Sequence, residues 1–120
     1  MSDILILSGS RTPIGSISGA LANYTAPQLA AKACADALAK AGVQGSELSE
    51  GVLGCVLSAG IGQAPARQAA IAAGIPACVG ATTVNKVCGS GMKAVMMASQ
   101  GIALGEGDYA LAGGMESMSK

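Results

Sequence analysis

Short apolar runs alternate with longer helical patterns along the whole chain, and this alternation is the strongest constraint on its fold. The runs are closed by glycine or polar residues and are rich in Val, Ile, Leu or Thr, which favours extended structure. Strands that alternate with helices form βαβ units, whose parallel strands are covered on both faces. We therefore expect an α/β fold of order βαβαβαβ with a mainly parallel sheet covered by helices. The predicted strands are residues 3–9, 51–60, 80–87 and 108–114, and the predicted helices are residues 25–41, 62–74 and 89–104.

The clearest helix signal follows the first predicted loop. Thr25 followed by Gln28 matches a capping box, in which each side chain accepts a hydrogen bond from the other residue's backbone N–H. Pro27 is tolerated in the first turn, and Gly42 stands where a left-handed residue commonly ends a helix. We therefore expect this helix to begin at Thr25 and to end just before Gly42.

The composition is typical of a chain that is covered by more protein. Charged residues make up 12% of the 120 residues, whereas soluble domains usually carry about 25%. Hydrophobic residues reach 51%, although Phe and Trp are absent. A domain of this size exposes much of its surface and normally covers that surface with charge. We therefore expect one domain, a large part of whose surface lies against the remainder of a longer chain or against partner subunits.

Charge, hydropathy and cysteine spacing exclude several classes of function. Seven basic and seven acidic residues are spread singly and give a net charge of zero, so we expect no nucleic-acid partner. The start of the chain lacks signal-peptide features, and the longest apolar stretch is interrupted by polar residues. We therefore expect a cytoplasmic protein that does not cross a membrane. Because histidine and Cys-x-x-Cys pairs are absent, we expect neither a zinc site nor a disulfide.

Cys88 stands where a predicted strand gives way to a predicted helix, in the stretch TTVNKVCGSGMKAVMMAS at residues 82–99. Ligands of parallel α/β sheets bind beyond the carboxyl ends of the strands. The first turn of the following helix presents free N–H groups, which stabilise an anion such as a thiolate by about 0.3 to 1 kcal/mol. Gly89 and Gly91 leave the backbone bare, so a substrate carbonyl can approach N–H groups that hold an oxyanion. These features leave two roles open for Cys88, a buried packing residue and a nucleophile.

Structural roles are the simplest interpretation of the other candidate residues. We expect Arg11 and Arg67 to be structural or interface residues rather than catalytic ones. Glu116 fits two roles, a solvated loop acid or a fixed hydrogen-bond acceptor. Core positions are expected for the remaining cysteines and for a methionine cluster, because both residue types commonly fill apolar interiors. These residues are Cys34, Cys55, Cys78, Met92, Met96 and Met97.

The segment GSGMKA at residues 89–94 also fits the dinucleotide-binding pattern G-x-G-x-x-A. That pattern requires an acidic residue at the end of the next strand, whereas Asp108 stands at the beginning of it. A long segment also precedes the motif, which in dinucleotide-binding domains follows the first strand. We therefore disfavour a dinucleotide site here.

Four motifs give the chain a resemblance to the thiolases, the acetyl-CoA C-acetyltransferases and their acyl-CoA relatives. The motifs occur in thiolase order, and the resemblance covers residues 4–120. Among the branches of the family, the chain looks most like the short-chain type that forms acetoacetyl-CoA. The motifs are RTPIG at 11–15, GQAPARQAA at 62–70, VNKVCGSGMKA at 84–94 and GGMESMS at 113–119.

The resemblance implies a five-layer αβαβα fold built from two similar halves, of which residues 1–120 supply most of the first. It implies that Cys88 is the nucleophile that carries an acyl group as a thioester, with its backbone N–H in an oxyanion hole. The implied substrates are coenzyme A thioesters, with no covalently bound cofactor, and no residue of this chain is assigned to a metal. The implied assembly is a homo-oligomer, a dimer or tetramer, with residues 62–70 and 113–119 at or near the dimer contact.

Several thiolase elements have no counterpart in these 120 residues. Thiolases also carry a Gly-His-Pro histidine that activates the nucleophile, an Asn-Glu segment for a second oxyanion hole, a Cys-x-Gly-Gly-Gly acid/base and a loop domain that holds most of the coenzyme A. We therefore expect an incomplete N-terminal domain that has no turnover by itself, because no base is available. A non-catalytic half-thiolase scaffold and a ketoacyl-synthase-like condensing enzyme are the alternatives. The GQAPARQAA and GGMESMS motifs favour thiolase over the synthase.

Overall fold

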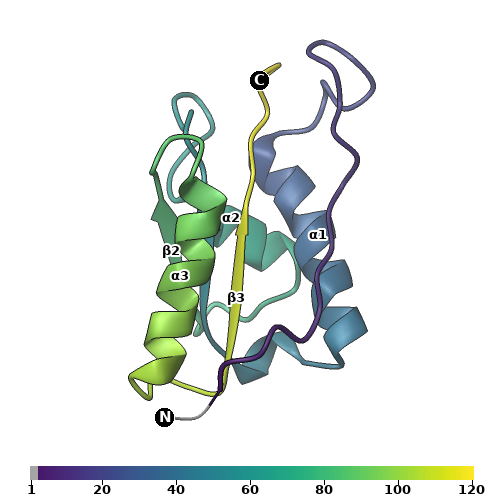
Figure 1. The fold of residues 1–120 in the computed structure, drawn as a ribbon. Coiled ribbons are helices and arrows are strands. Elements are labelled where there is room, and N and C mark those ends of the chain that lie inside the picture. The colour runs from purple at the N-terminus through teal and green to yellow at the C-terminus, as the bar shows by residue number, and fades with distance from the viewer. Residues whose placement is uncertain (1–2) are drawn as a thin grey trace.

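The computed structural model describes residues 3–120 and confirms the predicted α/β class (Figure 1). Six of the seven predicted elements are present, with ends that move by a few residues, and a short 3₁₀ helix is added. The largest change is in the strand predicted for residues 51–60, which begins three residues earlier and ends at Gly54. The elements are α1 (Ala26–Ala41), the 3₁₀ helix η1 (Gly45–Glu47), β1 (Leu48–Gly54), α2 (Pro65–Ala72), β2 (Gly80–Val84), α3 (Ser90–Ala103) and β3 (Tyr109–Gly114).

The three strands form a parallel sheet in the order β2-β1-β3, which confirms the predicted strand direction. In the centre of the sheet, Val52 of β1 is paired with Thr82 of β2 on one side and Ala112 of β3 on the other. Because β1 has a neighbour on both edges and a helix on both faces, its residues from Gly51 onward are buried. The carboxyl ends of all three strands therefore lie at the same edge of the sheet.

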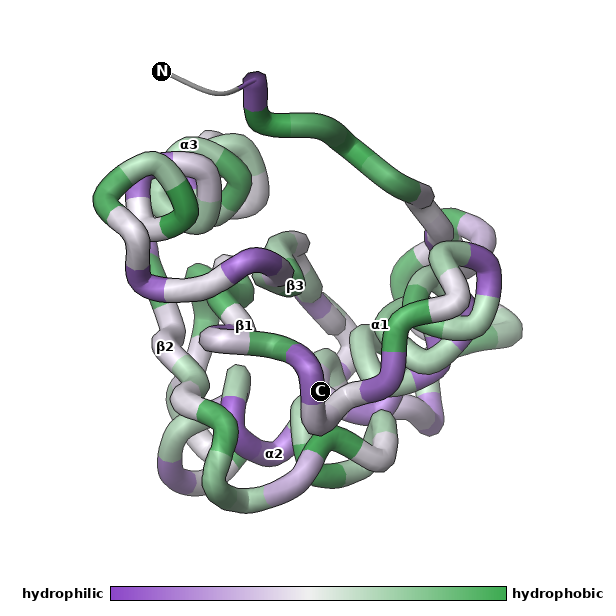
Figure 2. Tube along the Cα trace, turned by 90° about the horizontal axis from the view of Figure 1, so that it is seen from below, coloured by the Kyte–Doolittle hydropathy of each residue, from purple (hydrophilic) through white to green (hydrophobic). Residues whose placement is uncertain are grey.

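Helices cover the two faces of the sheet unequally. Figure 2 shows α3 and α2 on opposite sides of the strands, with α1 beside α2. The main core lies between α1, α2 and the sheet, where small alanines allow close packing around the larger residues Leu53 and Ile75. Its buried members are Ala30, Cys34, Leu48, Leu53, Ala66, Ala69, Ala70, Ile75, Val79 and Leu111.

The first helix ends as its local sequence predicts. Thr25 is the N-cap, and its hydroxyl accepts a hydrogen bond from Gln28 N at 3.3 Å. Gln28 Oε1 in turn accepts from Thr25 N at 2.8 Å, which completes the capping box. Gly42 adopts φ 67°, the left-handed conformation that closes the helix. These contacts involve neighbours only, so the sequence pattern was sufficient to predict them.

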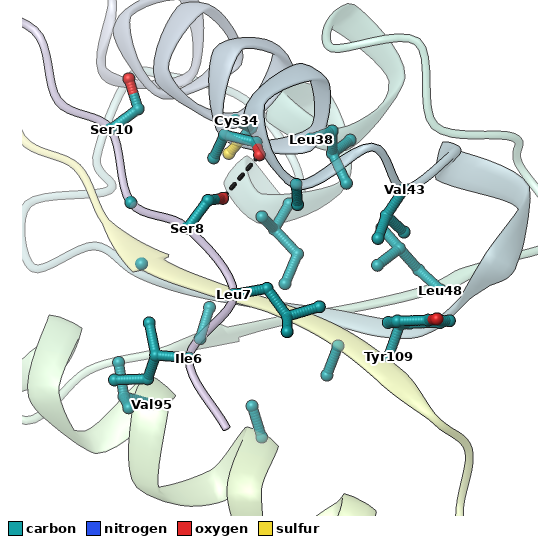
Figure 3. A pocket seen from close by; sticks show the side chains of 18 of the residues that line it. Ile6, Leu7, Ser8, Ser10, Cys34, Leu38, Val43, Leu48, Val95 and Tyr109 are labelled. Carbon is teal, nitrogen blue, oxygen red and sulfur yellow. Dashed lines mark hydrogen bonds between the residues drawn. The ribbon is translucent and has the colours of Figure 1, made fainter. Parts of the chain in front are cut away.

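The prediction of a strand at residues 3–9 is wrong for the part of the chain that the structure describes. The segment is extended but pairs with no strand among residues 3–120, and the side chains of Leu5 and Ile6 are 73% and 85% exposed. A cavity of about 340 Å³ lies between this segment and β3, and α1 and α3 form its flanks (Figure 3). Because this space separates the two backbones, no ladder of hydrogen bonds forms. The Ser8 hydroxyl instead donates to Ala37 O of α1 at 2.6 Å.

Part of the expected core is also exposed. Met92 is 74% exposed, Met96 is exposed and Met97 is half-buried, so the methionine cluster is not core filler. The outer face of α3 has no covering layer in the part of the chain that the structure describes, which explains why the prediction of a core position for these methionines is wrong. Cys78 is likewise exposed, in the turn between α2 and β2, and not in the core. Whether more protein covers these surfaces, as the composition suggests, stays a prediction.

Within residues 3–120, helices are too short or too polar to cross a membrane.

Candidate functional site

The candidate site lies at the edge of the sheet where all three strands end. Residues 55–58 follow β1, residues 85–89 join β2 to α3, and residues 115–119 follow β3. Because the strands are parallel, these three loops are neighbours in space. This is the edge at which parallel α/β sheets place ligands. The sequence places Cys88 in the second loop, and the structure confirms that position.

The loop before α3 is a tight turn with an unusual backbone. Val87 has φ 48°, in the left-handed region that β-branched residues rarely adopt. Asn85 Oδ1 accepts a hydrogen bond from Val87 N at 3.0 Å, and the Ser90 hydroxyl donates to Val87 O at 2.6 Å. Gly89 N and Ser90 N donate to the carbonyls three residues earlier. Hydrogen bonds between residues on the two sides of Cys88 therefore close the turn.

Cys88 is exposed, which contradicts a packing role. Its Cα lies two residues before the first residue of α3, where the helix presents its free N–H groups. The backbone N–H of Cys88 itself has no hydrogen-bond acceptor within residues 3–120. An exposed thiol next to an unpaired N–H can both attack a carbonyl carbon and stabilise the oxygen that becomes negative.

The two glycines that flank this turn differ in what they face. A Cβ at Gly91 would meet Gly114 Cα at 3.5 Å, which is ordinary van der Waals contact with β3. A Cβ at Gly89 would meet Lys86 O at 3.4 Å, within the turn itself. Their role in binding substrate stays a prediction.

Glu116 connects the other two loops, and the structure settles its role as a fixed acceptor. Its carboxylate accepts hydrogen bonds from Val56 N at 3.0 Å and from Leu57 N at 3.3 Å. Asn85 Nδ2 donates to Val56 O at 3.3 Å. The loop after β1 is therefore held from one side by the Cys88 turn and from the other by the loop after β3.

Sequence reasoning missed Asn85 and Ser90 as residues of this site. Both flank Cys88 closely, and both are residue types whose short side chains bond neighbouring backbone groups in turns. That propensity was visible in the sequence. The left-handed conformation of Val87, which these two side chains support, was not.

The remaining cysteines have different environments. Cys34 and Cys55 are buried, as expected for core residues. Burial raises the pKa of the Cys34 thiol to about 11. Burial also raises the pKa of Cys55, with a smaller contribution from the negative charge of Glu116. Both thiols therefore stay protonated and unreactive at neutral pH.

Arg67 is structural, as predicted. Its guanidinium donates from Nη1 to Val79 O at 2.6 Å and to Ala77 O at 3.1 Å, which ties α2 to the turn before β2. Arg11 is exposed at the rim of a second cavity of about 660 Å³. Its role as a structural or interface residue stays a prediction.

The three loops of the site supply a thiol and N–H donors, and Glu116 is the single carboxylate among their residues. The chain contains no histidine, and the Glu116 carboxylate is engaged by two backbone amides. Across the described range 3–120, no group of three His, Cys, Asp or Glu residues is arranged to hold a metal ion.

Comparison with known proteins agrees with the observed fold. The family model "Thiolase, N-terminal domain" matches residues 4–120. The chain is 52% identical over 119 residues to the acetyl-CoA acetyltransferase of Cupriavidus necator, covering 99% of this chain and 30% of the relative. It is 50% identical to the human mitochondrial acetyl-CoA acetyltransferase, covering 99% of this chain and 28% of the relative. The chain therefore spans less than a third of the length of these relatives.

A solved structure is similar over nearly the whole chain. The crystal structure of the Acat5 thiolase from Ascaris suum in complex with coenzyme A superposes with a TM-score of 0.93 and 42% sequence identity. The match covers 96% of this chain and 30% of that one.

Proposed function

This chain belongs to the thiolase family, and on that premise we propose that it carries the nucleophile of an acyltransferase that forms or cleaves acetoacetyl-CoA or another 3-ketoacyl-CoA. The observation that supports the proposal is the exposed Cys88 beside an unpaired backbone N–H at the start of α3. Coenzyme A thioesters are the proposed substrates, and no covalent cofactor is involved.

In the first proposed step, the Cys88 thiolate attacks the carbonyl carbon of acetyl-CoA. A new C–S bond forms, the carbonyl oxygen becomes an oxyanion, and the Cys88 N–H donates a hydrogen bond to it. The oxyanion then collapses, and coenzyme A leaves as a thiolate that takes up a proton. Cys88 now carries the acetyl group as a thioester.

In the second proposed step, another acetyl-CoA loses an α-proton, and the resulting carbanion attacks the thioester on Cys88. A C–C bond forms, the Cys88–acyl bond breaks, and acetoacetyl-CoA is released together with the Cys88 thiolate. The reverse direction cleaves a 3-ketoacyl-CoA. Each direction requires a base for the α-proton or for the thiol. This chain contains no histidine, and we propose that the base lies outside it. We therefore propose that residues 1–120 alone have no turnover.

Acyl transfer to the thiol is the decisive test. The complete gene product is incubated with radiolabelled acetyl-CoA, and the labelled peptide is identified by mass spectrometry. We expect label on Cys88, no label in Cys88→Ser, and unchanged label in Cys78→Ser, because Cys78 is the other exposed thiol. Absence of label on Cys88 in the wild-type protein refutes its role and leaves the non-catalytic scaffold as the better explanation.

We further propose that the complete protein is a cytoplasmic homo-oligomer, with residues 62–70 and 113–119 near the contact between subunits. The exposed apolar side chains on α3 and on residues 4–7 support association with more protein. Light scattering of the complete gene product tests the oligomeric state, and a monomer at micromolar concentration refutes it.

A further inference from the structure

We propose that Ser90 is a positioning residue whose buried hydroxyl holds the Cys88 turn in its reactive geometry. The inference rests on the proposed function, because the position of Cys88 matters only if its thiol reacts. The Ser90 hydroxyl makes its hydrogen bonds to backbone atoms and not to the thiol. It acts through the backbone of residues 86 and 87.

Ser90 is the only buried polar side chain in the described range 3–120, with 4% of its surface exposed. Its hydroxyl donates to Val87 O at 2.6 Å and accepts from Lys86 N at 2.8 Å. Both hydrogen-bonding capacities of the hydroxyl are therefore used within the turn. A buried hydroxyl with two partners is costly to remove, because its partners then lose their bonds.

The two hydrogen bonds span Cys88. Lys86 and Val87 lie before the cysteine in sequence, Ser90 lies after it, and the hydroxyl closes the ring between them. The backbone bonds from Gly89 N to Lys86 O and from Ser90 N to Val87 O complete the turn, at 3.0 and 3.1 Å. The Ser90 side chain therefore makes two of the four bonds that close the turn across Cys88.

Val87 explains why this turn needs support. Its backbone has φ 48°, a conformation that a β-branched residue rarely adopts. Its side chain is 64% exposed, so packing contributes little to holding it there. The conformation is held by hydrogen bonds, from Ser90 on one side and from Asn85 on the other. Without the Ser90 hydroxyl, we expect Val87 to return to negative φ, which redirects the backbone that leads into Cys88.

Ser90 itself is held in a fixed position by its contact with the sheet. Ser90 lies directly on Gly54, the last residue of the central strand β1, where an added Cβ would come within 2.6 Å of Ser90 C and Ser90 Cβ. Ser90 is therefore anchored on the core of the sheet. The hydrogen bonds of its hydroxyl therefore hold the exposed turn in place relative to the sheet.

The test uses Ser90→Ala in the complete gene product and compares alkylation of Cys88 and Cys78 by iodoacetamide at one pH. Cys78 is an internal reference, because it is exposed and lies away from the turn. We expect the Cys88/Cys78 labelling ratio to fall about two- to fivefold, because the displaced sulfur no longer faces the free N–H groups at the start of α3. We expect the rate of acetylation by acetyl-CoA to fall by roughly tenfold to a hundredfold, because misplacement by about 1 Å has effects of that order.

Ser99→Ala is the matched control. Ser99 also lies on α3, and its hydroxyl also donates to the carbonyl three residues earlier, Met96 O at 2.8 Å, but far from Cys88. We expect wild-type labelling and acetylation in this variant. An equal fall in both variants, or no fall in S90A, overturns the proposal.

A second substitution tests the mechanism. Glycine adopts positive φ freely, so Val87→Gly in the S90A background should restore part of the Cys88/Cys78 ratio. A double variant that labels no better than S90A contradicts the role assigned to Val87.

Hydrogen exchange of the wild-type protein gives a readout that does not depend on a variant folding. Lys86 N has the Ser90 hydroxyl as its acceptor, whereas Cys88 N has none, so the Lys86 amide should exchange more slowly. Equal exchange at the two amides overturns the proposal. If instead Cys88 is never acetylated in the wild type, the proposed function fails, while the labelling ratio and exchange still report on Ser90.

Discussion

Gly54 is the position at which the central strand comes closest to the site, and Gly54→Ala perturbs that contact directly. A Cβ there would lie 2.6 Å from Ser90 C and Ser90 Cβ and 2.9 Å from Gly91 N. Ordinary van der Waals contact begins at 3.4 Å, so the start of α3 must move by the difference from 2.6 Å, about 0.8 Å. Two of these three neighbours are backbone atoms, which cannot move aside by a change of rotamer.

The size of the effect follows from that displacement. Overpacking of a well-packed core costs about 1 to 3 kcal/mol, and we expect the upper end because the helix must move as a unit. A displacement near 1 Å at a reacting group lowers a rate by up to about a hundredfold. We therefore expect G54A to lower the melting temperature and to slow acetylation of Cys88 by roughly tenfold to a hundredfold.

Gly51→Ala is the control for this experiment. Gly51 lies on the same strand, but the nearest atom to its added Cβ is Gly80 O at 4.0 Å, in ordinary contact. Neither glycine has positive φ, so the two substitutions differ only in the space available. Thermal unfolding and acetylation are measured in the complete gene product. The reasoning is refuted if G54A and G51A behave alike in both assays.

Three further predictions concern stability and exposed surface. The pKa of Cys34 is raised from 9.0 to about 11, so its contribution to stability is complete below pH 9 and is lost as the pH rises towards 11, by about 2 to 3 kcal/mol. In urea unfolding, Cys34→Ala should lose less of its free energy of unfolding at alkaline pH than the wild type does. Cys78→Ala should lose as much as the wild type. Glu116→Gln should lower the free energy of unfolding by about 1 to 2 kcal/mol, because two backbone amides lose a charged acceptor; an unchanged melting curve contradicts this. Residues 1–120 purified alone should enhance the fluorescence of an apolar dye more than an equimolar amount of the complete gene product does, because side chains such as Leu5 and Met92 are exposed.

Features that depend on neighbouring residues were predictable from the amino-acid sequence. The capping box of Thr25 and Gln28 and the left-handed Gly42 form within one or two helical turns. The alternation of apolar runs with helical patterns likewise predicted six elements and a parallel sheet. The position of Cys88 between β2 and α3 follows from the same alternation. In each case the free energy that selects the conformation comes from contacts between residues close in sequence or from simple burial of an apolar face.

Features that depend on partners far apart in the chain appeared only in the folded structure. The two backbone amides that donate to the Glu116 carboxylate lie 59 and 60 residues away, and no local pattern specifies such a pair. Residues 3–9 have the composition of a buried strand, yet a strand exists only where another backbone lies at hydrogen-bonding distance, and a cavity lies there instead. The exposure of Met92 has the same origin, because burial depends on which surfaces meet. Local propensity thus defined the elements, and the long-range contacts decided which strands pair, which side chains are covered and how the turn at Cys88 is held.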